Sequence, residues 1–265
     1  MAVLRFPEPV ASGAPTELAA DLGGFRLQGA SVAARATALA VPDFGVALDV
    51  GRLSPCVAAQ PVVLLSHAHL DHSAGLLAYL NLRVRFHPEA PPVVVVPAEI
   101  LPALQAALAV MPGLESVRKR VNLEEVLRGV RDGEEVPLPG GTARAFARDH
   151  GVPTLGFALR RPGARRPALV YAADGRAGQF AERPELLDAD VAVVECSFVE
   201  ANRRVAAALG GHAHVRDWLE IAPLLPCNVL VLAHLPALSR GELLPLLQPL
   251  RAALGAGRGL LAWAE

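Results

Sequence analysis

The stretch VVLLSHAHLDHSAGLL, residues 62 to 77, decides how this sequence is interpreted. Four side chains that can bind a metal ion fall within six positions, namely His67, His69, Asp71 and His72. The valine and leucine run before them predicts a buried strand, and the residues from 73 onward predict a helix. Two histidines two positions apart lie on the same side of an extended chain, so both can reach one ion. A polar end to a buried strand, without metal, is the alternative interpretation.

Other apolar strands of the sequence also end in a polar side chain. The segments ARAFARDH, ALVYAAD, DVAVVE and NVLVLAH end in His150, Asp174, Glu195 and His234, respectively. In α/β sheets the strand ends form a crevice where ligands bind. Seven of the eight histidines belong to this group, the exception being His87 in a loop. One such histidine is more often a core residue, but imidazoles and carboxylates gathered in this number predict a metal centre.

Composition restricts the class of protein. The chain has 265 residues, 52% of them apolar, yet no run reaches the roughly 18 to 20 apolar residues of a membrane span. The N-terminus lacks the pattern of a secretory signal, and three scattered cysteines favour a reducing compartment, so we expect a cytoplasmic protein. The net charge of −1 gives no general attraction to nucleic acid. Two local basic clusters, SVRKRV (116–121) and RRPGARRP (160–167), permit a polyanionic substrate.

Strand patterns dominate the first part of the chain, and strands then alternate with amphipathic helices. Helices are predicted over 73–82, 98–111, 214–225 and 239–254. No low-complexity linker divides the chain. We therefore expect one α/β domain over 24–265, with two sheets and helices outside them, and an N-terminal extension over 1–23 that packs on this domain.

The His-x-His-x-Asp-His run resembles the signature of the metallo-β-lactamase superfamily. The segments ALDVGRLSP, DHGVPTLGF, VVECSF, GGHAHV and LAHLP narrow the resemblance to the short form of the tRNase Z (ribonuclease Z) family, which processes the 3′ end of tRNA. The likeness covers about residues 24 to 236. It implies a metallo-β-lactamase-like αβ/βα four-layer sandwich with two mixed sheets and outer helices.

The resemblance also implies roles for individual residues. One ion would be held by His67, His69 and His150, and a second by Asp71, His72 and His234, with Asp174 as the bridge. The implied catalytic residues are Asp71, Glu195 and His212, of which the last two would move a proton to the leaving group after a metal-bridging hydroxide attacks a phosphodiester. Asp49 and His214 would orient a ligand or contact the substrate, and Arg240 would replace the family's arginine. Zinc is the expected ion, manganese the alternative, and a homodimer is implied.

The resemblance departs from the family in the region that contacts tRNA. The family's long tRNA-gripping arm lies between the positions of His150 and Asp174, where this chain has only 23 residues. RNA affinity would then depend on a dimer surface or on the two basic clusters. Two alternatives to a tRNA-precursor enzyme therefore remain: a phosphodiesterase for a small or cyclic phosphate ester, and a metal-binding protein without turnover.

Overall fold

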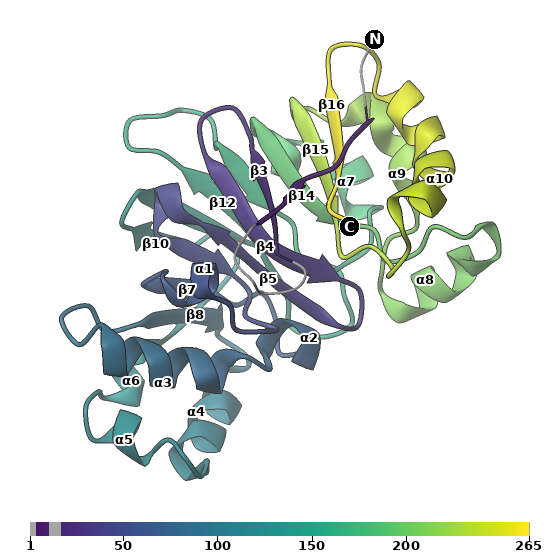
Figure 1. The fold of residues 1–265 in the computed structure, drawn as a ribbon. Coiled ribbons are helices and arrows are strands. Elements are labelled where there is room, and N and C mark those ends of the chain that lie inside the picture. The colour runs from purple at the N-terminus through teal and green to yellow at the C-terminus, as the bar shows by residue number, and fades with distance from the viewer. Residues whose placement is uncertain (1–3, 11–16, 265) are drawn as a thin grey trace.

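The computed structural model describes residues 4–10 and 17–264. Two eight-stranded sheets face each other, and helices cover the outer side of each sheet (Figure 1). The helices α9 and α10 lie outside one sheet, at the right of the view, and α3 to α6 lie outside the other, at lower left. The predicted αβ/βα four-layer sandwich is confirmed.

The first sheet, called sheet A, is antiparallel at one edge and parallel over the rest. Its strands, in spatial order, are β1 (Leu4–Arg5), β16 (Gly259–Ala262), β15 (Val229–Ala233), β14 (Val191–Glu195), β13 (Leu169–Tyr171), β12 (Leu155–Arg160), β11 (Gly141–Ala147) and β10 (Glu135–Leu138). The parallel part runs from β13 to β1, so the carboxyl ends of these strands meet at one edge of the sheet.

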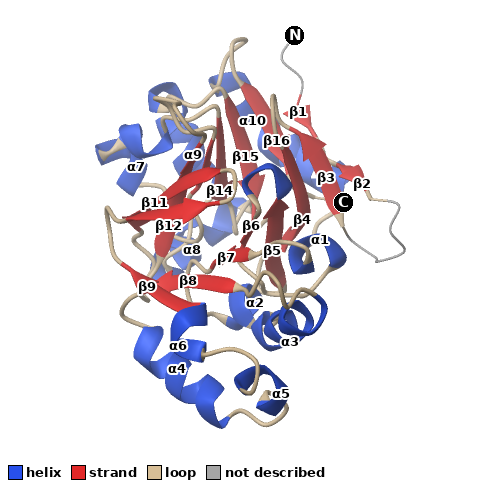
Figure 2. Ribbon diagram, turned by 90° about the vertical axis from the view of Figure 1, so that its left-hand side faces the viewer, coloured by secondary structure: helices blue, strands red, loops and turns tan. Residues whose placement is uncertain are grey.

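The second sheet, called sheet B, follows the same mixed plan. Its strands, in spatial order, are β2 (Glu8–Pro9), β3 (Leu18–Asp21), β4 (Arg26–Val32), β5 (Ala36–Val41), β6 (Val46–Leu48), β7 (Val62–Leu64), β8 (Val93–Pro97) and β9 (Leu127–Val130). Strands β2 to β6 are antiparallel neighbours, and β6 to β9 are parallel (Figure 2).

Each sheet is covered on its outer side by its own set of helices. Those on the side of sheet B are α1 (Pro55–Ala58), α2 (Leu70–Ser73), α3 (Leu76–Phe86), α4 (Leu101–Val110), α5 (Glu115–Arg118) and α6 (Leu123–Val126). Those on the side of sheet A are α7 (Gln179–Glu182), α8 (Arg204–Gly210), α9 (Val215–Ile221) and α10 (Arg240–Ala253). Short 3-10 helices are η1 (Pro42–Phe44), η2 (Pro184–Leu187), η3 (Ala201–Arg203) and η4 (Ala222–Leu224). In the described part of the chain, no helix has the length and apolar character that crossing a membrane requires.

Three apolar clusters hold the layers together, and β14 shows why its sequence is continuously apolar. Val191 and Val193 face the core between the two sheets, whereas Ala192 and Val194 face the helices outside sheet A. Successive side chains of a strand point to opposite faces, so a strand buried on both sides needs apolar residues at every position. The third cluster joins sheet B to its helices around the fully buried Tyr79.

Of the first 23 residues, expected as an extension, the structure describes 4–10 and 17–23, and these contribute strands to both sheets, whereas 1–3 and 11–16 lie outside the described residues. Strand β1 extends sheet A by parallel pairing with β16, and β3 extends sheet B by antiparallel pairing with β4. Strands β9 and β16 are additional to the segments that the sequence predicts. The stretch 73–82 predicted as one helix is divided between α2 and α3.

The chain turns sharply where several strands end. Asp49 follows β6, Ala173 follows β13 and His234 follows β15, and all three have a left-handed backbone, with φ of 59°, 52° and 50°. Residues other than glycine adopt this conformation at a cost of about 1 to 3 kcal/mol, and such residues cluster at functional sites. All three turns lie at the edge where the parallel strands of the two sheets end.

Candidate metal centre

Three imidazoles meet at the carboxyl ends of β7 and β11. His67 and His69 follow β7, and His150 follows β11. Nδ1 of His69 lies 3.1 Å from Nε2 of His67 and 3.3 Å from Nε2 of His150. These three ring nitrogens converge on one point, which makes the three residues a candidate metal-ligand group.

A second group forms beside the first, from α2 and the end of β15. Nε2 of His234 lies 3.1 Å from Oδ2 of Asp71 and 3.3 Å from Nε2 of His72. These three side chains also have their ligand atoms close enough to share one ion. The six-position motif therefore divides between the two groups, as the resemblance implies.

The carboxylate of Asp174, which follows β13, lies between the two groups. Its Oδ2 is 3.4 Å from Nε2 of His72, 3.6 Å from Nε2 of His234 and 3.9 Å from Nε2 of His150. The first two nitrogens belong to the second group and the third belongs to the first group. One carboxylate that faces both sets of nitrogens can bridge two ions.

The spacing of these donors fits metal coordination. Two ligands that each lie about 2.1 Å from a tetrahedral ion are about 3.4 Å from each other. The distances between neighbouring donor atoms, 3.1 to 3.9 Å, surround this value. The donor set of imidazoles and carboxylates suits zinc and related divalent ions.

Hydrogen bonds from outside the cluster orient four of the five imidazoles. In each of these rings Nδ1 has a protein partner, so that Nε2 is the nitrogen that faces the cluster. The pairs are His67 with Ser66 Oγ at 2.9 Å, His72 with Asp49 Oδ2 at 2.7 Å, His150 with the Gly211 carbonyl at 2.9 Å, and His234 with Ser197 Oγ at 2.9 Å. Such partners fix the tautomer and direction of metal-binding histidines.

Asp49 is the centre of a buried network behind the cluster. Its carboxylate accepts hydrogen bonds from the backbone N–H of Ser66 at 2.6 Å, from the Ser66 hydroxyl at 2.8 Å, and from the Tyr171 hydroxyl. Asp49 has no exposed surface. Because Oδ2 of Asp49 also lies 2.7 Å from Nδ1 of His72, the network holds this ring in one direction.

The electrostatics of the cluster favour a bound cation. Burial lowers the pKa of His67 to about 2 and also lowers the pKa of His150, so both rings are neutral and can donate a lone pair. Burial would raise the pKa of Asp174, but His234 and His72 lower it well below its usual range. Burial would lower the pKa of His72, but Asp174 and Asp49 raise it well above its usual value. That end of the cluster therefore favours a positive charge, which a metal ion can supply.

Glu195 and His212 form a pair directly beside the cluster. Oε1 of Glu195, at the end of β14, lies 3.1 Å from Nδ1 of His212, whose same nitrogen is 3.8 Å from Asp174 Oδ2. The glutamate is fixed because it also accepts hydrogen bonds from the backbone of Ala213 and from the backbone and hydroxyl of Ser197. Burial would lower the pKa of His212, but Glu195 raises it above its usual value. This geometry suits an imidazole that carries and donates a proton.

His214 and Arg240 do not join the cluster. His214 is fully buried, its Nδ1 accepts a hydrogen bond from the backbone N–H of Arg216, and its Nε2 donates to the Glu200 carbonyl. It caps the start of α9, so its contacts do not support the expected contact with a ligand or with substrate. Arg240, the first residue of α10, donates to the Pro7 carbonyl and stacks on Phe6, so it serves the N-terminal segment instead.

Four polar groups of the site were not predicted from the sequence. They are the hydroxyls of Ser66, Ser197 and Tyr171 and the carbonyl of Gly211. A serine beside a metal-binding motif, as in SHAH and ECSF, is the only sequence signal for two of them. Cys196, between Glu195 and Ser197, is buried among the residues outside sheet A, as strand alternation predicts.

Comparison with known proteins gives results that agree with this site. A family model described as the beta-lactamase superfamily domain matches residues 40–235. Two curated relatives are from Arabidopsis thaliana: tRNase Z TRZ1, 28% identical over 142 residues, and the chloroplastic tRNase Z TRZ2, 23% identical over 246 residues. These alignments cover 53% and 81% of this chain, but 49% and 68% of the relatives, so the match to TRZ1 spans about half of that protein.

Two solved structures share the fold. The metallo-beta-lactamase fold protein YhfI from Bacillus subtilis has a TM-score of 0.63 and 17% identity, with 100% of this chain and 95% of that chain covered. The short form of human tRNase Z has a TM-score of 0.58 and 17% identity, with 78% and 91% covered. At this identity the two structures establish the similarity of fold.

Proposed function

Because the chain belongs to the beta-lactamase superfamily, we propose that it is a metal-dependent phosphodiesterase of the tRNase Z type, which cleaves a phosphodiester of a tRNA precursor. The observation that carries this proposal is the Glu195–His212 pair, 3.1 Å apart, placed directly against a cluster of five imidazoles and two carboxylates. In a purely structural metal site, protein ligands occupy every coordination position, and a proton-carrying side chain beside the ion has no function.

The two groups of donors would hold two divalent ions. His67, His69 and His150 would hold one ion, Asp71, His72 and His234 the other, and Asp174 would face both. When bound, such ions supply Lewis-acid activation of the phosphate and of the attacking water. Asp49, through its hydrogen bond to Nδ1 of His72, keeps Nε2 of that ring directed at the second position.

Glu195 and His212 would complete the reaction at the leaving group. The negative charge of Glu195 favours the protonated form of His212, and its hydrogen bond to Nδ1 leaves Nε2 as the nitrogen for the substrate. The side chain of His212 is 21% exposed, so a substrate oxygen can approach it. Donation of this proton to the departing oxygen avoids the release of an alkoxide.

The proposal includes three further properties. Zinc is the proposed ion, because it is commonly bound by imidazole and carboxylate together, with manganese as the alternative. A homodimer follows from the family resemblance. A cytoplasmic location is supported by Cys56, Cys196 and Cys227, which are all free thiols.

The connection between β12 and β13 favours a second candidate function. These strands are joined only by residues 161–168, which include a turn closed by a hydrogen bond from the Ala164 N–H to the Arg161 carbonyl, so the region where the family carries its arm is short here. An enzyme without that arm has less surface for a large RNA, which favours a small or cyclic phosphodiester as the alternative substrate. A metal-binding protein without turnover is the third candidate, and the Glu195–His212 pair argues against it.

One experiment separates these candidates. The protein is loaded with Zn²⁺ or Mn²⁺ and incubated in parallel with a 3′-extended tRNA precursor, bis(p-nitrophenyl) phosphate and cyclic nucleotides. Cleavage of the precursor supports the tRNase Z proposal. Cleavage of the small esters alone removes that proposal and supports the second candidate, whereas a metal-loaded protein that cleaves none of them supports the third.

A further inference from the structure

The two basic clusters of the sequence differ in their surroundings. In the cluster over 160–167, Arg160 is paired with Glu135 at 2.7 Å, and Arg166 is paired with Asp188 at 2.8 Å and with Asp190 at 3.2 Å. Carboxylates so close cancel most of the field that would attract a polyanion. Of the other two arginines, Arg161 donates to the Gly24 carbonyl, and Arg165 is exposed with no carboxylate in ion-pair distance among the described residues, so this cluster keeps only part of its charge.

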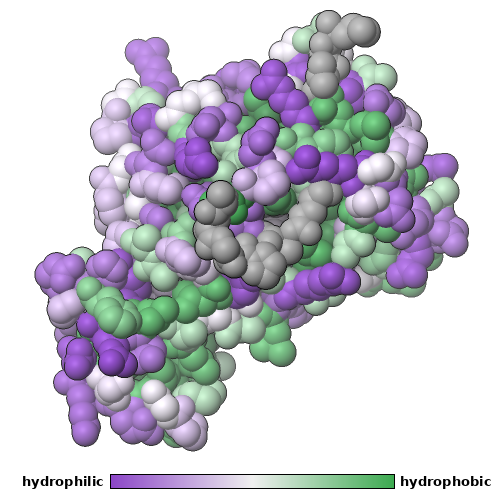
Figure 3. Space-filling model, in the orientation of Figure 1, coloured by the Kyte–Doolittle hydropathy of each residue, from purple (hydrophilic) through white to green (hydrophobic). Residues whose placement is uncertain are grey.

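The cluster at α5, together with the adjacent Arg85, keeps most of its charge. Arg85, Lys119 and Arg120 are exposed, and among the described residues no carboxylate lies within ion-pair distance of their charged groups. The neighbouring Arg118 is different, because it donates to the Leu108 and Met111 carbonyls and pairs with Glu115. We define the basic patch as Arg85, Lys119 and Arg120. It belongs to the lobe formed by α3 to α6, whose outer edge is hydrophilic (Figure 3).

The surface at the patch is hollowed on two sides. A hollow of about 170 Å³ between the end of α3 and α5 is lined by Arg85 and Arg120, with the amide of Asn81 and the hydroxyl of Ser116, and by no carboxylate. A wider hollow of about 780 Å³ on the other side of α5 includes Lys119 and Arg120, with Glu124 as its one carboxylate. Guanidinium groups with neutral hydrogen-bond donors beside them suit phosphate oxygens, which accept paired hydrogen bonds.

An exposed aromatic ring adjoins the basic patch. Phe86 ends α3 with 62% of its surface exposed, and the Arg85 guanidinium lies 5.5 Å from the centre of its ring. Aromatic rings among basic side chains are typical of surfaces that bind single-stranded nucleic acid, because bases stack on the ring while cations contact the phosphates. A polyanion without bases would gain nothing from this ring.

The position of α3 relates the patch to the metal centre. This helix begins at Leu76, four residues after His72, and its eleven residues span about 16 Å. In Figure 1, α2 and α5 lie toward opposite ends of α3. A phosphodiester of a single nucleotide that sits in the metal centre cannot reach the patch, whereas a polynucleotide can.

We propose that the basic patch binds the phosphate backbone of the RNA substrate and takes over part of the binding that the short β12–β13 connection does not provide. This inference rests on the proposed function. It assigns the RNA to one surface of the lobe and leaves the chemistry at the metal centre unchanged.

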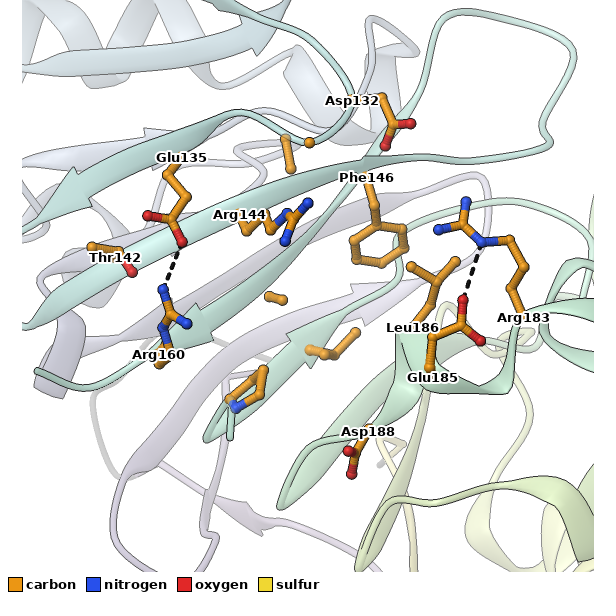
Figure 4. Close-up of a pocket in the computed structure, with 15 residues that line it drawn as sticks. Asp132, Glu135, Thr142, Arg144, Phe146, Arg160, Arg183, Glu185, Leu186 and Asp188 are labelled. Carbon is orange, nitrogen blue, oxygen red and sulfur yellow. Dashed lines mark hydrogen bonds and ion pairs between the residues drawn. The ribbon is translucent and has the colours of Figure 1, made fainter. Parts of the chain in front are cut away.

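The test compares two charge-reversed variants. The patch variant is Arg85→Glu/Lys119→Glu/Arg120→Glu, and the matched control is Arg144→Glu/Arg160→Glu/Arg183→Glu, which changes the net charge equally. The control arginines line a pocket of about 400 Å³ outside sheet A (Figure 4), where Glu135, Glu185, Asp132 and Asp188 balance them. For both variants and the wild type, KM and kcat are measured on a 3′-extended tRNA precursor at several salt concentrations and on bis(p-nitrophenyl) phosphate.

The patch variant should raise KM for the precursor by tenfold or more and lower the salt slope of RNA affinity by about 2 to 3, since each lost phosphate contact removes about 0.7 to 0.9. Hydrolysis of bis(p-nitrophenyl) phosphate should stay as in the wild type, and the control should behave as the wild type on both substrates. A wild type that cleaves the precursor and a patch variant that does so equally well, or no worse than the control, would overturn the patch assignment alone. A wild type that hydrolyses the small ester but neither binds nor cleaves the precursor would overturn both the tRNase Z proposal and the patch assignment.

Discussion

Nδ1 of His72 lies 2.7 Å from Oδ2 of Asp49, and both side chains are completely buried. This contact explains why an aspartate at the end of β6, 23 residues before the histidine, belongs to the site. It fixes the tautomer of His72, so that Nε2 faces His234 and Asp174. The consequence can be tested through metal affinity.

Asp49→Asn should weaken metal binding by about 10- to 100-fold. The amide is nearly isosteric, but it carries no charge to hold the imidazole and cannot serve all the donors that now converge on the carboxylate. Competition with a fluorescent chelator measures the change. Asp188→Asn, at an exposed ion pair, is the control and should bind metal as the wild type does. Equal affinity of the two variants would show that Asp49 does not position His72.

His212→Ala should retain the bound metal and lower kcat by about 10² to 10⁴. The side chain belongs to the pair with Glu195 and is not needed by either three-residue ligand group. Elemental analysis measures the bound metal, and kcat is measured on the 3′-extended tRNA precursor, whose leaving oxygen is an alkoxide that needs the proton; bis(p-nitrophenyl) phosphate, whose leaving group departs as the anion, should be affected much less. His87→Ala, at a half-buried histidine beside Glu89 and outside the cluster, is the matched control and should change neither. If the metal content of His212→Ala falls instead, His212 is a ligand and its proposed role is wrong.

Ser197→Ala should lower kcat by about tenfold or more while KM changes little. The hydroxyl lies 2.7 Å from Glu195 Oε2, 2.9 Å from His234 Nδ1 and 3.3 Å from His212 Nδ1, so it positions both the proton-transfer pair and a candidate ligand. Ser197→Thr retains the hydroxyl and should restore most of the activity. A threonine variant as slow as the alanine variant would point to packing and not to the hydroxyl.

His214→Ala should destabilise the fold by about 2 kcal/mol without loss of metal. The change removes the cap of α9, worth about 1 kcal/mol, and the hydrogen bond to the Glu200 carbonyl, worth about 1 kcal/mol. Urea unfolding measures the loss. His214→Asn keeps an acceptor for the cap and should be less destabilised. If the stability stays unchanged and turnover is lost, His214 acts in the active site and its role as a cap is wrong.

The sequence predicted much of the site because the residues of a metal centre are chemically distinctive. Histidine and aspartate after buried strands stand out from their apolar surroundings, and parallel strands bring their carboxyl ends together, as for His150 and Asp174. The supporting hydroxyls were not predicted. A single serine or tyrosine is equally common in turns and cores, and only the fold shows that Tyr171 reaches Asp49 across 122 positions.

The fold was predicted at the level of layers and less well at its edges. The short strands β1 and β9 lack a long periodic pattern, and their pairing with distant strands decides their conformation. Arg240 was misplaced for a similar reason. Arg240 was expected to replace the family's arginine because of its distance from His234 along the chain. In the structure it lies at the start of α10 and contacts Pro7 and Phe6 instead.

The central claim is that the cluster of imidazoles and carboxylates holds two divalent ions. Elemental analysis of the protein, loaded with Zn²⁺ or Mn²⁺ and then freed of unbound metal by gel filtration, measures the number of bound ions per chain directly. We predict two ions per chain in the wild type and at most one in His72→Ala/His234→Ala, which removes two donors of one group. A wild type that binds no metal, or only one ion per chain under both conditions, would contradict the claim.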